Sequence, residues 1–182
     1  MEYVGWVGTF FGITSFALIS LGKIKKEGFL FSFLSAIASG AFLFSSYLIS
    51  NYQAVISNVF FLSSSLLALF GIFLNIKNIK ESSLYILCLL AFSISSIYYI
   101  FFTKEVWIFH SLGWIPVISL PMIFFLFTQN RITEIKYYYL NMITNTIFFI
   151  HLIYFNNTPL AILQIISFIF AFIGIKRINS KI

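Results

Sequence analysis

The chain contains no aspartate, and charged residues of any kind make up 9% of its 182 residues. Such a low charge content excludes a water-soluble globular domain, because soluble proteins carry about a quarter charged residues. Hydrophobic residues make up 60% of the sequence, and the mean hydropathy is +1.00. We therefore expect lipid, rather than water, to surround most side chains.

The five acidic residues all fall at expected helix ends or in loops: Glu2, Glu27, Glu81, Glu105 and Glu134. Ion-coupled transporters usually hold a carboxylate within the membrane, so this placement favours passive transport over driven transport. The sequence also lacks a glycine-rich phosphate loop, a Cys and His cluster and a Ser-His-Asp arrangement. We therefore expect no enzyme activity, no metal and no cofactor.

Long apolar runs predict an all-helical, polytopic membrane protein. A helix crosses the hydrocarbon core with roughly 20 apolar residues, so a chain of this length has room for about six to eight spans. Seven are predicted, at residues 3–21, 29–49, 53–74, 84–102, 111–127, 137–155 and 160–175, with a loop at 104–110. Polar and charged interruptions set these boundaries.

Basic residues orient the predicted helices. With seven spans, one side of the membrane receives ten of the 11 Lys and Arg residues: Lys23, Lys25, Lys26, Lys77, Lys80, Arg131, Lys136, Lys176, Arg177 and Lys181. Lys104 alone falls on the other side. Cytoplasmic loops carry the excess of Lys and Arg, so the N-terminus is predicted outside and the C-terminus in the cytoplasm. This charge should meet anionic lipid headgroups, not nucleic acid.

The predicted helices form an internal repeat. Two motif pairs align at one offset of 108 positions, Gly5-Trp6 with Gly113-Trp114 and Lys23-Ile24 with Arg131-Ile132. Each predicted triplet of helices also has a basic first loop and an uncharged second loop. We therefore expect two parallel three-helix units, 1–75 and 110–182, joined by a linker helix with flanking loops at 76–109.

This three-plus-one-plus-three arrangement resembles the SWEET and PQ-loop class of transporters. The opening Gly-Trp, the Gly22-Lys23 helix end and the turn from Asn51 to Ala54, with Asn58 beyond it, are similar to the YgjV family of bacterial inner-membrane proteins. The YgjV resemblance covers nearly the whole chain.

The SWEET resemblance implies a substrate-facing asparagine in the third helix of each unit. Asn58 occupies that place in the first unit, and the alignment puts Ile165, beside Gln164, in the second. The resemblance also implies prolines in the first helix of each unit. Pro116 and Pro121 lie in the predicted helix 111–127, whereas the predicted helix 3–21 has none.

Four amides inside predicted spans are the candidate substrate-binding residues: Asn58, Asn141, Asn145 and Gln164. An amide in hydrocarbon needs a hydrogen-bonding partner, so each must face protein or a water-filled cavity. They either line a pocket for a small polar solute or hydrogen-bond neighbouring helices together. Trp6 and Trp114 either form aromatic walls around that pocket or lie in the aromatic belt at the membrane surface.

The leading hypothesis is a passive small-solute facilitator whose two triplets rock about a site at the membrane midplane. One alternative is a non-transporting scaffold or accessory subunit, in which the amides serve helix packing. Another is a lipid- or ligand-sensing receptor with a pocket open to one side. The sequence leaves a homo-oligomer open.

Overall fold

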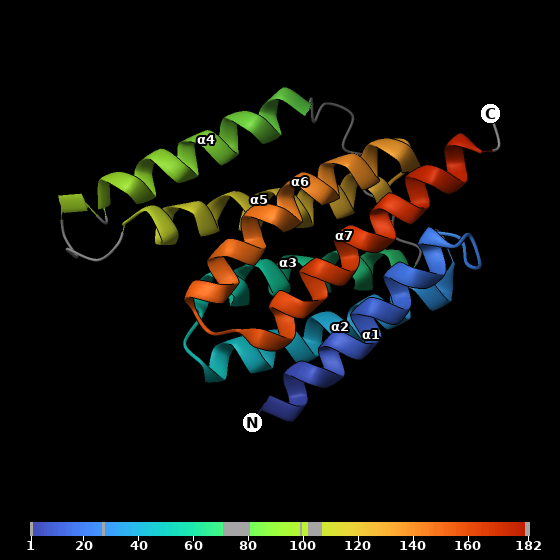
Figure 1. The fold of residues 1–182 in the computed structure, drawn as a ribbon, viewed down its shortest axis with the longest axis horizontal. Coiled ribbons are helices and arrows are strands. Elements are labelled where there is room, and N and C mark those ends of the chain that lie inside the picture. Colours follow the sequence, from blue (N-terminus) through green and yellow to red (C-terminus); the bar gives the residue numbers. More distant parts are fainter. Residues whose placement is uncertain (1, 27, 71–80, 99, 102–106, 181–182) are drawn as a thin grey trace.

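The computed structural model describes residues 2–26, 28–70, 81–98, 100–101 and 107–180. These residues form seven α-helices and no strand, which confirms the all-helical prediction (Figure 1). The helices are α1 (Glu2–Ser20), α2 (Phe29–Leu48), α3 (Tyr52–Leu69), α4 (Glu81–Tyr98), α5 (Trp107–Thr128), α6 (Glu134–Tyr154) and α7 (Thr158–Asn179).

Four helices extend at least three residues beyond a predicted limit, and one of them is α4, which begins at Glu81 rather than at residue 84. α6 begins at Glu134, three residues early, because the Thr133 side chain accepts a hydrogen bond from the backbone N–H of Lys136 and caps the helix. α5 begins at Trp107, so residues 107–110 of the predicted loop are helical. α7 continues past residue 175 to Asn179. The predicted ends of the third helix at residue 74 and the fourth at residue 102 lie outside the described residues.

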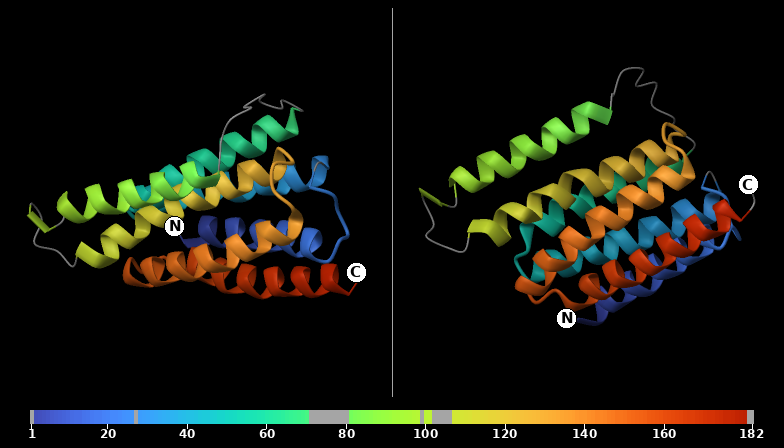
Figure 2. Two further views of the ribbon diagram at one scale, coloured as in Figure 1. Left: turned by 90° about the horizontal axis from the view of Figure 1, so that it is seen from above. Right: turned by 45° about the horizontal axis from the view of Figure 1, so that its top comes forward.

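Six of the helices form a closed ring. α1 packs against α2, α2 against α3, α3 against α5, α5 against α6, α6 against α7, and α7 against α1. α4 packs against α5 from outside this ring, with Ser95 Oγ 3.3 Å from Ser111 Oγ (Figures 1 and 2). The α1–α2 turn, the α5–α6 turn and the end of α7 lie at one end of the bundle. The N-terminus and the α2–α3 and α6–α7 turns lie at the other.

Four helices end in the same backbone motif. Gly22, Ser50, Asn130 and Asn156 follow α1, α2, α5 and α6 with left-handed φ values of 69°, 57°, 59° and 53°. In each case the next N–H reaches back to a carbonyl five residues earlier, as Lys23 N does to Leu18 O at 2.8 Å. A left-handed residue reverses the chain and satisfies carbonyls at the helix end. These residues provide fixed points from which positions in different helices can be compared.

The distribution of polar residues is reversed relative to a water-soluble protein. Large apolar side chains such as Phe10, Leu89 and Ile143 cover the outside, whereas serines, threonines, asparagines and glutamines are buried. Five helices, α1, α2, α3, α5 and α7, are long and apolar enough to cross a membrane. α6 is excluded from that set by composition, because polar side chains, including Asn141 and Asn145, lower its hydropathy.

Two apolar clusters fill the ring at different levels. The first, here called the inner cluster, lies toward the basic turns and contains Phe16, Ile19, Phe31, Cys88, Ile123, Phe124, Leu126, Phe127, Ile132, Tyr137, Tyr138, Ala171 and Ile175. The second, the outer cluster, contains Ala38, Phe42, Ala54, Leu120, Phe148, Leu152, Leu160 and Ala161. Residues of both clusters border the cavity described next.

Candidate functional site

A cavity of about 120 Å³ lies between the six helices of the ring, and every ring helix contributes to its wall. We call it the central cavity. Its lining residues are Gly12, Ser15, Phe16, Phe31, Ser35, Ala38, Ser39, Phe42, Ser57, Asn58, Phe61, Leu120, Phe124, Tyr137, Asn141, Asn145, Phe148, Leu160, Leu163, Gln164 and Ser167. The space is large enough for several waters or a small solute. None of its lining residues carries a formal charge.

All four candidate amides line the central cavity. Asn58 comes from α3, Asn141 and Asn145 from α6, and Gln164 from α7, and all four residues are buried. The spacing of Asn141 and Asn145 places both on one face of α6, because residues four apart in a helix are neighbours. The ring thus brings together polar groups from three helices that are distant in sequence.

The hydrogen bonds of these amides stay within single helices. Asn58 Nδ2 donates to the carbonyl of Ala54 at 2.7 Å, one turn earlier in α3. Asn145 Nδ2 donates to Asn141 Oδ1 at 3.2 Å, one turn earlier in α6. Gln164 makes no hydrogen bond with any other residue that the structure describes. The amides therefore retain hydrogen-bonding capacity toward the cavity and do not connect neighbouring helices.

Serines complete the polar part of the wall, and sequence reasoning missed them as site residues. Ser15 Oγ and Ser35 Oγ are 3.0 Å apart across the α1–α2 contact, and Ser39 Oγ donates to the Ser35 carbonyl at 2.8 Å. The buried Ser57 hydroxyl has no partner among the described residues. A signal was present, because Ser35 and Ser39 have the same four-residue spacing as Asn141 and Asn145.

Trp6 and Trp114, for which the sequence left aromatic walls and an interfacial belt open, lie away from the central cavity. Trp6 is 41% exposed and borders a separate cleft near the α6–α7 turn, and Trp114 is half-buried. Neither lines the central cavity, because each lies more than one helical turn before Gly12 or Leu120, the first lining residue of its helix. The aromatic lining consists of Phe16, Phe31, Phe42, Phe61, Phe124, Tyr137 and Phe148.

The lining residues occupy matching positions in different helices. Counted from the left-handed residues that end the helices, Gly12 and Phe16 of α1 match Leu120 and Phe124 of α5. The same comparison of α2 with α6 pairs Phe31 with Tyr137, Ser35 with Asn141, Ser39 with Asn145, and Phe42 with Phe148. Every residue of these pairs lines the cavity. The two halves of the wall therefore follow one pattern with different side chains.

The helix caps correct the alignment of α3 with α7. Asn51 accepts from the N–H of Ala54 at 3.1 Å, and Asn157 accepts from the N–H of Leu160 at 3.4 Å. Counted from these N-caps, the counterpart of Asn58 is Gln164, not Ile165. The sequence alignment, which paired Asn58 with Ile165, and the count from the N-caps therefore differ by one residue. Both third helices thus carry a cavity-lining amide at the same position.

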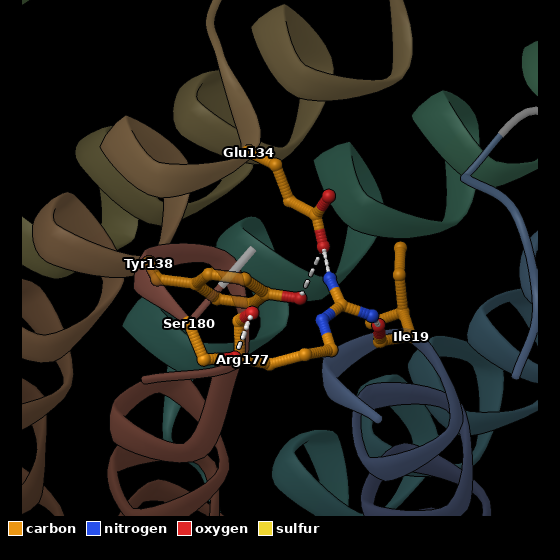
Figure 3. A network of polar contacts seen from close by, with 5 residues as sticks. All are labelled: Ile19, Glu134, Tyr138, Arg177 and Ser180. Atoms are coloured by element: carbon orange, nitrogen blue, oxygen red, sulfur yellow. Dashed lines mark hydrogen bonds and ion pairs between the residues drawn. The ribbon is translucent and has the colours of Figure 1, made fainter. Parts of the chain in front are cut away.

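An ionic network lies at the basic end of the ring (Figure 3). Arg177 of α7 forms an ion pair with Glu134 of α6 and donates through Nη1 to the carbonyl of Ile19 at 3.1 Å. Tyr138 donates to the same glutamate oxygen at 3.0 Å. The Ile19 carbonyl, in the last turn of α1, also accepts from the backbone N–H of Gly22 at 2.9 Å. Arg177 therefore joins three helix ends beside the inner cluster.

The reversed polarity and the five membrane-length apolar helices define an all-helical integral membrane protein. The sequence model of an uncharacterised protein family matches residues 1–76. No curated protein and no solved structure matches the chain.

Proposed function

We propose that this chain is a passive facilitator of a small uncharged solute in the bacterial inner membrane. It is built from two parallel three-helix units with the general architecture of the SWEET and PQ-loop class. The observation that carries the proposal is the convergence of Asn58, Asn141, Asn145 and Gln164 on one cavity. That cavity lies where the two units meet, as a shared binding site requires.

The packing of two glycines supports the two-unit architecture. A methyl group added at Gly5 would lie 2.8 Å from Ser45 Oγ and 3.1 Å from Pro159. One added at Gly113 would meet His151 and Gln53. Counted from the left-handed residues that end α2 and α6, His151 is the counterpart of Ser45. Counted from the N-caps of α3 and α7, Pro159 is the counterpart of Gln53. Each unit's first helix therefore makes equivalent close contacts with its own second helix and with the third helix of the other unit.

The order of helices in the ring agrees with the same architecture. If α1, α2 and α3 are replaced by α5, α6 and α7 respectively, and the reverse, the same ring of helix contacts results. The two contacts between units, α3 with α5 and α7 with α1, then change places. α4 lies outside the ring, as a linker helix should (Figure 1). α6 has 21 residues and packs between α5 and α7, so we include it among the membrane-crossing helices.

The composition of the cavity supports a neutral solute and passive movement. Its amides and hydroxyls both donate and accept hydrogen bonds, and its phenylalanines offer flat apolar faces. A charged solute would find no opposite charge on the wall, and burying an unpaired charge is costly. Without a lining carboxylate, the site also lacks the group that usually couples transport to protons or sodium.

The scaffold hypothesis makes a different prediction for the amides. If their role were to hold helices together, their hydrogen bonds should cross between helices. The bonds made by Asn58 and Asn145 remain within α3 and α6, and Gln164 forms none with the described residues. This pattern favours a binding cavity over structural cross-links.

The test is solute flux into proteoliposomes that contain the purified protein. We expect protein-dependent entry of at least one member of a panel of glycerol, erythritol, urea and a monosaccharide, unaffected by collapse of the proton and sodium gradients. Asn145→Leu should lower this flux by about tenfold, the effect of removing one good hydrogen bond to a solute. Ser63→Leu is the matched control, because it also removes a polar group, from the exposed face of α3. Equal flux for Asn145→Leu and wild type would refute the assignment.

A further inference from the structure

A second concave surface lies against the central cavity, on the outside of the ring between α6 and α7. It has a volume of about 190 Å³ and is almost entirely apolar, with Phe149, Ile165, Phe168 and Ile169 in its wall. We call it the lateral groove. Ile165, Phe168 and Ile169 are exposed, so in a membrane the groove faces lipid. It is a surface on which a hydrocarbon chain can lie.

The lateral groove and the central cavity share two lining residues, Asn145 and Gln164. Both are nearly fully buried, at 2% and 5% exposure, so they stand between the two spaces rather than in either one. The central cavity and the lateral groove therefore meet at two amide side chains. A polar partition facing hydrocarbon on one side is unusual, because polar side chains normally face the bundle interior or water.

Thicker layers of side chains lie above and below the cavity along the membrane normal. Toward the basic end, Tyr137 stacks on Phe127 with ring centroids 3.9 Å apart, within the inner cluster. Toward the other end, Phe42, Phe148 and Leu160 belong to the outer cluster. Entry through either cluster requires several packed side chains to move. On the side of the lateral groove, Asn145 and Gln164 are the residues common to both linings.

We infer that the ligand of the central cavity is an uncharged amphiphile that enters from the bilayer between α6 and α7. Its hydroxyl or amide head contacts Asn145 and Gln164, and its hydrocarbon part lies in the lateral groove. The carbonyl oxygen of Asn145 and the whole amide of Gln164 have no partner among the described residues, so together they supply a donor and two acceptors. This inference rests on the proposed function in taking the central cavity as a ligand site.

The experiment uses a long-chain primary alcohol with a photoreactive diazirine in its chain. The probe is added to the full-length protein in phosphatidylcholine nanodiscs, and the labelled residues are mapped by peptide mass spectrometry. We expect labelling to concentrate on the α6 and α7 residues of the lateral groove, and an excess of the unlabelled alcohol should suppress it. An excess of the carboxylate of equal chain length should not.

A pair of tryptophan variants gives a matched comparison. We call the labelling that the unlabelled alcohol suppresses competable labelling. Ile165→Trp fills the lateral groove at a residue that does not line the central cavity, and it should lower the competable labelling by about tenfold. Val59→Trp should leave labelling unchanged. Val59 is also 45% exposed and occupies the position of Ile165 when α3 and α7 are counted from their N-caps.

Labelling spread evenly over the lipid-facing helices, or equal labelling of the two tryptophan variants, would overturn the inference. Equal competition by the carboxylate would overturn the uncharged head. Solute flux without competable labelling would also reject lateral entry, while the facilitator proposal would stand. Competable labelling without flux of any panel solute would uphold the inference and refute only that proposal.

Discussion

At the scale of single residues, the unusual feature is a buried amide without a partner. An amide that faces a cavity and bonds to no residue depends on water or a bound solute for its hydrogen bonds. Gln164 is 5% exposed and bonds to no described residue, whereas Asn58 and Asn145 each have a bond within their own helix. An amide kept free of bonds to the protein is what a binding residue requires.

Replacing Gln164 with leucine should therefore lower transport without lowering stability. We expect the free energy of unfolding in nanodiscs to change by less than about 1 kcal/mol, because leucine has a similar size and the amide it replaces bonds to no described residue. Flux of the panel solute should fall in the same variant. If Gln164→Leu instead unfolds more easily, the amide has a structural partner and the binding role is wrong.

Two glycines provide a test of packing at the residue scale. A methyl group at Gly174 would lie 2.5 Å from the ring of Tyr138, which is fully buried and hydrogen-bonded to Glu134. Gly174→Ala should therefore destabilise the protein by about 1–3 kcal/mol, the usual effect of overpacking. At Gly40 nothing lies within 4 Å, so Gly40→Ala should be neutral or stabilising. Thermal unfolding midpoints that fall equally in both variants would contradict the described contact between α6 and α7.

At the scale of helices, the ends of α1, α6 and α7 are tied together by one cation. Arg177 pairs with Glu134 and adds a second hydrogen bond to the Ile19 carbonyl in the last turn of α1, where a positive charge also interacts favourably with the helix dipole. The pair is partly exposed, so the carbonyl bond and the connection of three elements matter more than the ion pair itself. This junction joins the end of α7 to the start of α6 and the end of α1.

Arg177→Gln should lower the free energy of unfolding by about 1–3 kcal/mol, the range for hydrogen bonds to charged groups. Arg131→Gln is the control, because it removes an equal charge from an exposed residue at the same end of the bundle. Chemical unfolding in one detergent would compare the two variants. Similar losses for both would mean that net charge, and not the junction, determines the effect.

At the scale of the whole molecule, helices could be predicted from sequence more readily than their arrangement. Apolar runs fixed α1 and α2 to within about one residue, because Gly22 and Ser50 end them sharply. The start of α6 was missed although Thr133 followed by an acidic residue is a helix-start signal. The segment before residue 137 was predicted to be a loop because it is charged, but charged residues also occupy the first turns of helices.

The candidate site was predictable in part. Amides in apolar helices must face polar surroundings, so Asn58, Asn141, Asn145 and Gln164 could be named from sequence. That they share one cavity depends on which helices are neighbours in the ring, and helix periodicity carries no such information. The serine contribution was hidden for a related reason, since Ser35 and Ser39 serve equally well for close helix packing.

The orientation of the molecule in the membrane remains a prediction from its charge. Lys23, Lys25, Lys26 and Arg131 all lie in turns at the end of the bundle where α7 finishes (Figure 2). Alkaline phosphatase fused after Ser50 should be active, because that turn is predicted outside, and the same enzyme fused after Asn130 should be inactive. The reverse pattern would invert the molecule in the membrane.

The central claim is that the buried amides face a solvated cavity, and cysteine reactivity in native membranes tests it most directly. On a Cys88→Ser background, Asn145→Cys should react with a small, uncharged, water-soluble thiol reagent, because a thiol ionises where water reaches it. Ile143→Cys, also on α6 but 63% exposed toward lipid, should not react. Reaction at Asn145→Cys that is slowed by the transported solute would establish the site. An unreactive Asn145→Cys in folded protein would show a dry, packed interior and contradict the account.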